Sequence, residues 1–307
     1  MRGWRLHASF LYLRGSYEDK SKSAGNGSTG QVGGALVPRL VADQGVEVVA
    51  AARTPAKAKH LGVEVVEFDL DRIETFGPAL ESIDRIFMAT GYTVDMLRQS
   101  KDLVNSAKRA GVQQIVHLGA CGDDDTRVAH YGWHQFIERY IEWSGISFTH
   151  LRPEIFMQNL LGYGGESYVQ KGVIKHYVGG ARLSWVDCDD VAAIAAVCLA
   201  DPEPHAGKTY RMGYEAKTYY ELAEVFTEVL GQPFSYEPQP PSDFLQNVLA
   251  AGAEPAYMKC VFDSYTDLTN GKDIGADATF DNFPELTGRA PRSLADFART
   301  YSDRFRY

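Results

Sequence analysis

The sequence has few cysteines, less positive than negative charge and no long apolar run, and each shortage excludes a class of protein. Cys121, Cys188, Cys198 and Cys260 form no Cys-x-x-Cys pair, so neither a zinc site nor a disulfide framework is indicated. A net charge of -9 argues against nucleic-acid binding and leaves no polybasic face for a membrane. No apolar run approaches the roughly 20 residues of a membrane span. No cleavage site of small residues follows the apolar core of residues 1–14, so we expect a cytoplasmic enzyme or binding protein.

What is present, from residue 45 onward, is a regular alternation of apolar runs and helical segments. Strand-length apolar runs occur at residues 46–52, 63–68, 85–89, 114–118 and 148–151. Helical periodicity occupies residues 95–110, 131–144, 189–199 and 219–230. This alternation predicts an α/β fold with a doubly wound, Rossmann-like parallel sheet that is covered on both faces. We expect residues 1–150 to form the sheet domain, and residues 151–307 to complete the sheet and form a smaller C-terminal α/β lobe.

A glycine-rich stretch near the N-terminus resembles a phosphate-binding turn. Gly27, Gly30 and Gly33 give the spacing Gly-x-x-Gly-x-x-Gly. The candidate loop runs through Gly27, Ser28, Thr29, Gly30, Gln31, Val32 and Gly33. Glycines permit a tight turn, and the free N–H groups at a helix N-terminus can bind a phosphate. If a strand precedes it, this turn marks residues 1–150 as an NAD(P)-binding domain.

The residues on either side of the glycines predict a helix after them and a strand before them. Val32, Leu36, Leu40 and Val41 are predicted to share the helix face that packs on the sheet. Before the glycines, Leu6–Leu13 is the candidate first strand, and it would need a polar loop of about a dozen residues, against the usual 2–6. Either the loop is unusual or the N-terminus does not represent an intact first strand, and the sequence leaves both open.

Arg53 stands at the end of the second predicted strand, about 20 residues past the glycines. An acid at this place binds the 2′-hydroxyl of the adenosine ribose, whereas an arginine accommodates a 2′-phosphate. Lys57 follows one helical turn later, and no acid lies nearby. We therefore expect NADP(H) rather than NAD(H), with a solvated charge at the start of a helix as the alternative.

The ends of the next strands are also expected to lie along a cofactor. Asp69 and Leu70 follow the third strand, where Asp69 could accept a hydrogen bond from the adenine amine. A carboxylate that caps the next helix is an equal alternative. Thr90 and Gly91 follow the fourth strand, and strand ends converge on the ligand site of a doubly wound sheet. Small residues are also what any tight turn requires.

The helix after the fifth strand opens with Tyr131, Trp133 and His134. A Tyr-x-x-x-Lys pair would supply the proton donor of a short-chain dehydrogenase, but Gln135 stands at the lysine position. His134 could instead hydrogen-bond the nicotinamide or donate a proton near neutral pH. A polar histidine on the helix surface is an equal alternative. Tyr131 is the second candidate donor.

Two acidic clusters do not indicate a metal site. Three consecutive acids in one loop, Asp123–Asp125, cannot all converge on one cation. Asp187, Asp189 and Asp190 precede a helix, where carboxylates act as caps. We therefore expect no metal.

An ordered series of motifs resembles the NmrA-like family of atypical short-chain dehydrogenases. Gly-Ser-Thr-Gly-Gln-Val-Gly from Gly27, Ala-Ala-Arg-Thr-Pro around Arg53 and Phe-Asp-Leu-Asp from Phe68 come first. The stretch from Trp133 to Glu138 and the later Leu-Arg-Pro follow. The most specific part is Arg152-Pro153-x-x-Phe156-Met157-x-Asn159. The series runs from about residue 25 to the C-terminus.

The resemblance implies a Rossmann-like NAD(P)-binding domain with a small substrate lobe. It places Gly27, Gly30, Gly33, Arg53 and Lys57 at cofactor-phosphate positions. His134 stands where many members have a lysine beside the nicotinamide, and Phe156 and Asn159 match the strip along the cofactor. Tyr92, Trp133, Phe156 and Asn159 are the expected substrate residues.

These observations predict an NADPH-dependent oxidoreductase that passes hydride to a small electrophile, such as a quinone, an azo compound or an aldehyde. Quinone and azo acceptors need little help from a protein acid, which suits a chain without the tyrosine–lysine pair. The rival interpretation is a redox sensor or regulatory protein that binds NAD(P) without turnover. The expected partner is a small molecule, not nucleic acid or membrane.

Overall fold

The computed structural model describes residues 4–9, 31–42, 46–162, 168–272 and 274–307. The chain divides into two compact units. Unit 1 comprises residues 1–120, 133–152 and 191–210, and unit 2 comprises residues 121–132, 153–190 and 211–307.

Unit 1 is built around a seven-stranded sheet with the order β11-β6-β5-β4-β1-β2-β3. Its strands are β1 Trp4–Ser9, β2 Val46–Ala52, β3 Glu64–Glu67, β4 Arg85–Ala89, β5 Gln114–Leu118, β6 Ser147–Pro153 and β11 Lys208–Met212. The strands β1 to β6 pair in parallel, with Leu6 opposite both Val48 and Arg85. Ile86 and Phe87 on β4 point to opposite faces and both are buried, as expected for a sheet covered on both sides.

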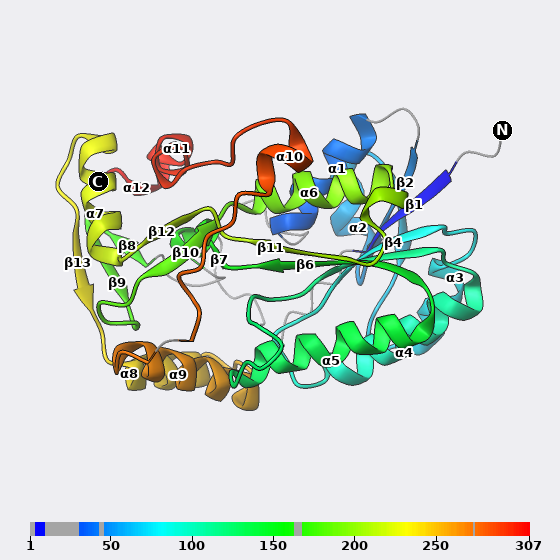
Figure 1. Ribbon diagram of the computed structural model, residues 1–307, viewed down its shortest axis with the longest axis horizontal. Helices are drawn as coiled ribbons and strands as arrows, with labels where there is room; N and C mark the ends of the chain where they lie inside the picture. Colours follow the sequence, from blue (N-terminus) through cyan, green and yellow to red (C-terminus); the bar gives the residue numbers. More distant parts are fainter. Residues whose placement is uncertain (1–3, 10–30, 43–45, 163–167, 273) are drawn as a thin grey trace. The chain divides into compact units, whose positions relative to one another are not determined.

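Helices cover both faces of this sheet. They are α1 Gln31–Ala42, α2 Pro55–Ala58, α3 Phe76–Ala79, α4 Met96–Ala110, α5 Ala129–Ser144 and α6 Cys188–Ala200. Figure 1 shows α4 and α5 on one face, and α1 and α6 on the other. This is the doubly wound, Rossmann-like architecture that the alternating pattern predicts.

The first strand lies inside the sheet, between β4 and β2. β1 pairs with both β2 and β4, so the chain has the strand that a dinucleotide-binding turn requires. β1 is Trp4–Ser9, which overlaps the predicted Leu6–Leu13 at residues 6–9; residues 10–13 lie outside the described part. The predicted phosphate loop from Gly27 to Gly30 also lies outside it, whereas Gln31, Val32 and Gly33 begin α1.

The buried face of α1 differs from the expectation at one residue. Val32, Leu36 and Leu40 are buried together with Val37, but Val41 is 52% exposed. At 100° per residue, Val41 lies half a turn around the helix from Val32, so the two side chains cannot share a face.

Unit 2 contains two small sheets and a separate core. The sheets have the orders β12-β10-β7 and β13-β9-β8. Their strands are β7 Ile155–Phe156, β8 Val169–Gln170, β9 Val173–His176, β10 Leu183–Val186, β12 Glu215–Lys217 and β13 Ser235–Pro238. The helices are α7 Tyr219–Leu230, α8 Pro241–Ala250, α9 Pro255–Thr269, α10 Phe283–Thr287, α11 Leu294–Thr300 and α12 Ser302–Phe305. Trp185, Tyr219, Phe226 and Phe297 are fully buried at its centre.

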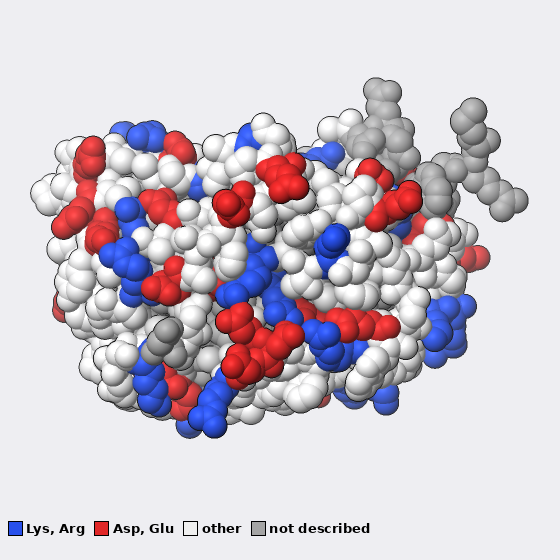
Figure 2. All heavy atoms as spheres, in the orientation of Figure 1, with Lys and Arg blue, Asp and Glu red and all other residues white. Residues whose placement is uncertain are grey.

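The surface gives two further facts. Figure 2 shows acidic and basic side chains intermingled on the face in view. Among the described residues, the helices are all too short or too polar to cross a membrane.

Candidate active site

The predicted cofactor residues of unit 1 stand at the carboxyl ends of neighbouring parallel strands. Arg53 follows β2 directly, and Lys57 lies in α2 one turn later; both are exposed. Thr90 and Gly91 follow β4. Because parallel strands end at the same edge of a sheet, these residues share the edge at which doubly wound folds bind ligands.

Asp69 and Leu70 have structural roles at the end of β3. The Asp69 carboxylate accepts a hydrogen bond from the Asp71 N–H at 3.1 Å, and its own N–H donates to the Thr75 hydroxyl at 3.0 Å. Leu70 is 2% exposed and belongs to the core. One oxygen of the Asp69 carboxylate thus takes part in the turn after β3, and the binding of adenine by Asp69 stays a prediction.

His134 lies in α5 and is buried, which rules out the alternative of a histidine on the helix surface. Its ring centroid lies 5.8 Å from that of His117 on β5. Trp133, its neighbour, is half-buried, and Tyr92 after β4 is 47% exposed. In unit 2, Tyr131 and Phe156 are half-buried, and the side-chain oxygen of Asn159 is buried without a hydrogen-bond partner among the described residues.

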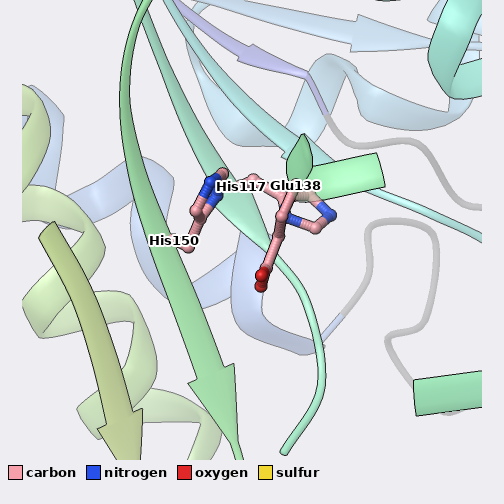
Figure 3. Close-up of side chains that lie close together, drawn as sticks. All are labelled: His117, Glu138 and His150. Carbon is pink, nitrogen blue, oxygen red and sulfur yellow. The ribbon is translucent and has the colours of Figure 1, made fainter. Parts of the chain in front are cut away.

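A buried polar cluster joins α5 to strands β5 and β6. His117, Glu138 and His150 place potential metal-ligand atoms within 4.8 Å of one another (Figure 3). Arg152, however, donates to both carboxylate oxygens of Glu138, from Nε at 3.0 Å and from Nη2 at 2.6 Å. A metal ion would have to share this carboxylate with a guanidinium. The arrangement is therefore explained by the buried ion pair.

The two histidines of this cluster are neutral. Burial lowers the pKa of His117 to about 3, and the Arg152 charge adds to the effect. Burial likewise lowers the pKa of His150 to about 2, helped by His117 and Arg152. Gly119 completes the packing, since a Cβ there would lie 3.2 Å from the Glu138 carboxylate and 3.3 Å from the His117 ring.

A second buried carboxylate, Glu154, lies in unit 2 directly after β6. Its backbone N–H donates to Met212 O at 2.7 Å, and its side chain is fully buried. Arg211 approaches it, with Nη2 at 3.6 Å from Oε1, and pairs through Nη1 with the exposed Asp123 at 2.5 Å. Burial raises the pKa of Glu154 to about 7, although Cys121 and Arg211 oppose the shift.

This raised pKa predicts a pH-dependent stability that Glu154→Gln removes. The ordinary pKa is 4.5, so the folded state binds the proton more tightly than the unfolded chain. The resulting stabilisation is complete below about pH 4.5 and is lost as the pH rises through about 7. Urea unfolding measures this effect. Between pH 5 and pH 8, the free energy of unfolding of wild type should fall by about 2–3 kcal/mol more than that of Glu154→Gln. The exposed Glu228→Gln is the control and should follow wild type. Parallel curves for all three proteins would contradict the assignment.

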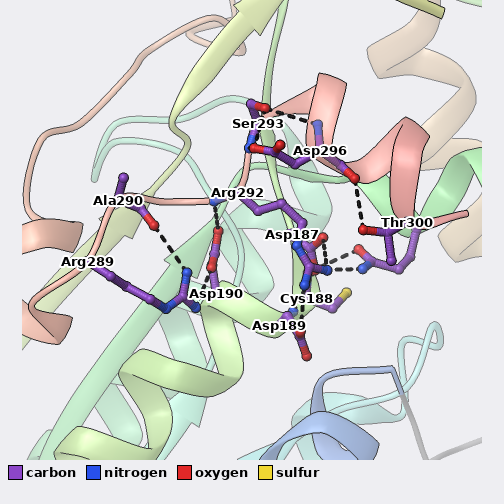
Figure 4. Close-up of polar contacts among 11 residues, drawn as sticks. Asp187, Cys188, Asp189, Asp190, Arg289, Ala290, Arg292, Ser293, Asp296 and Thr300 are labelled. Carbon is purple, nitrogen blue, oxygen red and sulfur yellow. Dashed lines mark hydrogen bonds and ion pairs between the residues drawn. The ribbon is translucent and has the colours of Figure 1, made fainter. Parts of the chain in front are cut away.

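The acids at the start of α6 form an ion-pair network in unit 2 (Figure 4). Asp187 is fully buried and accepts from Gln158 Nε2 at 2.7 Å, from the Asp189 N–H at 2.8 Å and from Arg292 Nη1 at 2.9 Å. The neighbouring Asp190 pairs with Arg289 at 2.8 Å and accepts from the Arg292 N–H at 2.6 Å. Capping is thus only part of the role of these acids, because they also fix the C-terminal segment.

Sequence reasoning missed two pairs of residues here. The Glu138–Arg152 pair is signalled only by the position of Arg152 in the Arg-Pro-x-x-Phe-Met-x-Asn block. The approach of Arg211 to Glu154 joins positions 57 residues apart and leaves no local pattern. Of the four cysteines, Cys121, Cys188 and Cys198 are buried, and Cys260 is partly exposed.

The sheet order, the first strand between β4 and β2, and the ligand edge define a Rossmann-like NAD(P)-binding fold. The chain belongs to the NmrA-like family, whose model matches residues 20–285.

Three known proteins illustrate the relationship. The NAD(P)H azoreductase of Xenophilus azovorans is 28% identical over 286 residues, which cover 91% of this chain and 97% of the relative. Quinone oxidoreductase 2 of Escherichia coli K12 is 26% identical, over 88% of this chain and 95% of the relative. The structure of Citrobacter sp. triphenylmethane reductase complexed with NADP(H) has a TM-score of 0.75 at 24% identity, covering 88% of this chain and 96% of that one.

Proposed function

We propose that this protein is an NADPH-dependent reductase that transfers hydride to a small electrophile, namely a quinone, an azo compound or an aldehyde. The observation that carries the proposal is Arg53, the exposed cation directly after β2, with Lys57 one turn later. This is the position that faces the adenosine ribose in a doubly wound sheet, and a guanidinium there suits a 2′-phosphate. The names of the azoreductase and quinone oxidoreductase relatives support the same class of reaction.

The described residues fit NADPH at three points. The N-terminal N–H groups of α1, at Gln31, Val32 and Gly33, would hold the pyrophosphate, and Gly33 is buried where the helix approaches the sheet. Arg53 and Lys57 would hold the 2′-phosphate. The bound nicotinamide supplies the hydride, and the protein binds the acceptor, orients it and excludes water. His134 and Tyr131 are the proposed proton donors near the nicotinamide.

The proposal is tested by binding first and by turnover second. Fluorescence titration is expected to show tighter binding of NADPH than of NADH. Anaerobic mixing with quinone, azo, aldehyde and triphenylmethane acceptors is then expected to consume NADPH with at least one of them. Binding without any turnover would support a sensor and contradict the reductase, and no binding of either dinucleotide would contradict both.

A further inference from the structure

We propose that the buried polar cluster of unit 1 is a binding site for one internal water molecule, which hydrogen-bonds to His117, His150 and Glu138. All three residues belong to unit 1, so the site is complete within that unit. The ion pair with Arg152 accounts for the burial of the Glu138 carboxylate. It does not account for the two histidines, whose ring nitrogens it leaves without partners.

The register of the sheet brings the two histidines together. His117 on β5 and His150 on β6 are partners on neighbouring parallel strands. Paired residues on neighbouring strands point to the same face of a sheet. The two ring centroids lie 5.6 Å apart, with the ring planes at 88°. Both side chains are 0% exposed, so bulk solvent does not satisfy their nitrogens.

Helix α5 supplies the third side chain of the site. Glu138 and Glu142 are four residues apart, so both lie along the same side of this helix. Glu138 is fully buried, and Glu142 Oε1 approaches His150 Nε2 to 3.4 Å without the alignment of a hydrogen bond. The helix therefore brings a carboxylate to the two rings (Figure 3).

The hydrogen-bonding needs of the histidines define what the site binds. None of the four ring nitrogens of His117 and His150 has a hydrogen-bond partner among the described residues. Burial keeps both rings neutral, with a pKa of about 3 for His117 and about 2 for His150. A neutral imidazole has one N–H donor and one acceptor nitrogen. Buried polar groups are paired with protein or with water, so these rings require a small molecule that both accepts and donates.

The spacing of the three side chains fits a water molecule. One ligand atom from each of His117, His150 and Glu138 lies within 4.8 Å of the other two. Three atoms with this spacing lie within about 2.8 Å of a common point, which is the length of a hydrogen bond to a water oxygen. A water there accepts from the N–H of one ring and donates to the other ring and to the carboxylate. Three hydrogen bonds are typical of an internal water.

Arg152 favours a neutral molecule over a metal ion at this site. It donates to both oxygens of Glu138, from Nε at 3.0 Å and from Nη2 at 2.6 Å. A metal ion would place a second positive charge beside the guanidinium in the interior, where only one carboxylate balances them. Water brings no charge and leaves the ion pair intact.

The first test counts long-lived internal waters by magnetic relaxation dispersion in isotopically labelled water. Phenylalanine keeps the shape of a histidine ring and removes both nitrogens. We expect His117→Phe and His150→Phe each to lower the count by about one. His205→Phe is the matched control, because His205 is a buried histidine of unit 1 whose Nδ1 already bonds the Tyr210 hydroxyl at 2.7 Å. This variant should keep the count of wild type.

The second test is a high-resolution crystal structure of wild type, which depends on no variant. We expect one density peak about 2.8 Å from a nitrogen of each histidine and from an oxygen of Glu138. A peak at about 2.0–2.2 Å from the same atoms, with the anomalous signal of zinc, would replace the water by a metal and overturn the proposal. A structure without a peak, or an unchanged count in both phenylalanine variants, would also overturn it. Each of these outcomes leaves the reductase function intact, and failure of wild type to oxidise NADPH leaves the water site intact.

Discussion

Replacing Arg152 with methionine should lower the free energy of unfolding by about 3–5 kcal/mol, because it leaves a buried carboxylate without its partner. Glu138 is fully buried, and Arg152 donates to both of its oxygens. Burial raises the pKa of Glu138, while Arg152 acts to lower it. Without the guanidinium, the carboxylate must either remain charged in the interior or take up a proton.

Urea unfolding at neutral pH measures this effect, and two variants control it. Arg299→Met removes an exposed cation that pairs with Asp296 at 2.8 Å, and it should cost less than about 1 kcal/mol. The double variant Arg152→Met with Glu138→Leu removes both charges and should recover much of the loss. A cost for Arg152→Met no larger than that for Arg299→Met would show that the buried pair does not stabilise unit 1.

Arg53→Ala should weaken NADPH binding about 10-fold to 100-fold while leaving NADH binding unchanged. A charge-assisted hydrogen bond contributes about 1.5–3 kcal/mol, which corresponds to a factor of this size in the dissociation constant. NADH lacks the 2′-phosphate, so its affinity should not change when the guanidinium is removed. Fluorescence titration of both dinucleotides measures the ratio directly.

Lys59→Ala is the matched control for Arg53→Ala. Lys59 is an exposed cation that directly follows α2, six residues beyond Arg53, and its removal should leave the NADPH to NADH ratio near that of wild type. An equal loss of affinity for both dinucleotides in Arg53→Ala, or no loss, would mean that Arg53 is only a solvated charge.

The sheet of unit 1 was predictable because its strands are local apolar runs separated by clear turn signals. Strands β4 and β5 have the predicted bounds, and α4 ends at Ala110 as predicted. α7 also has its predicted bounds, Tyr219–Leu230, with a capping box between Thr218 and Glu221. Such signals lie within a few residues of the element that they define, so one sequence suffices to find them.

The buried polar contacts were not predictable, because they join distant parts of the chain. Asp187 meets Arg292 across 105 positions, and nothing near Asp187 distinguishes an ion-pair partner from a helix cap. Glu154 occupies an unspecified x position in the Arg-Pro-x-x-Phe-Met-x-Asn block. Only the fold brings Arg211 and Cys121 close to it. The burial of His134 was likewise not predictable, because it depends on packing against other elements and not on the sequence of its own helix.

The measurement that tests the central claim most directly is anaerobic single turnover with NADPH deuterated at the transferring carbon. The protein, the labelled NADPH and a triphenylmethane or aldehyde acceptor are mixed, and the product is examined by mass spectrometry. We expect one NADPH consumed per product formed, deuterium on the product carbon, and a slower reaction with the label than without it. Bound NADPH that is never consumed by any acceptor, or a product without the label, would contradict hydride transfer by this protein.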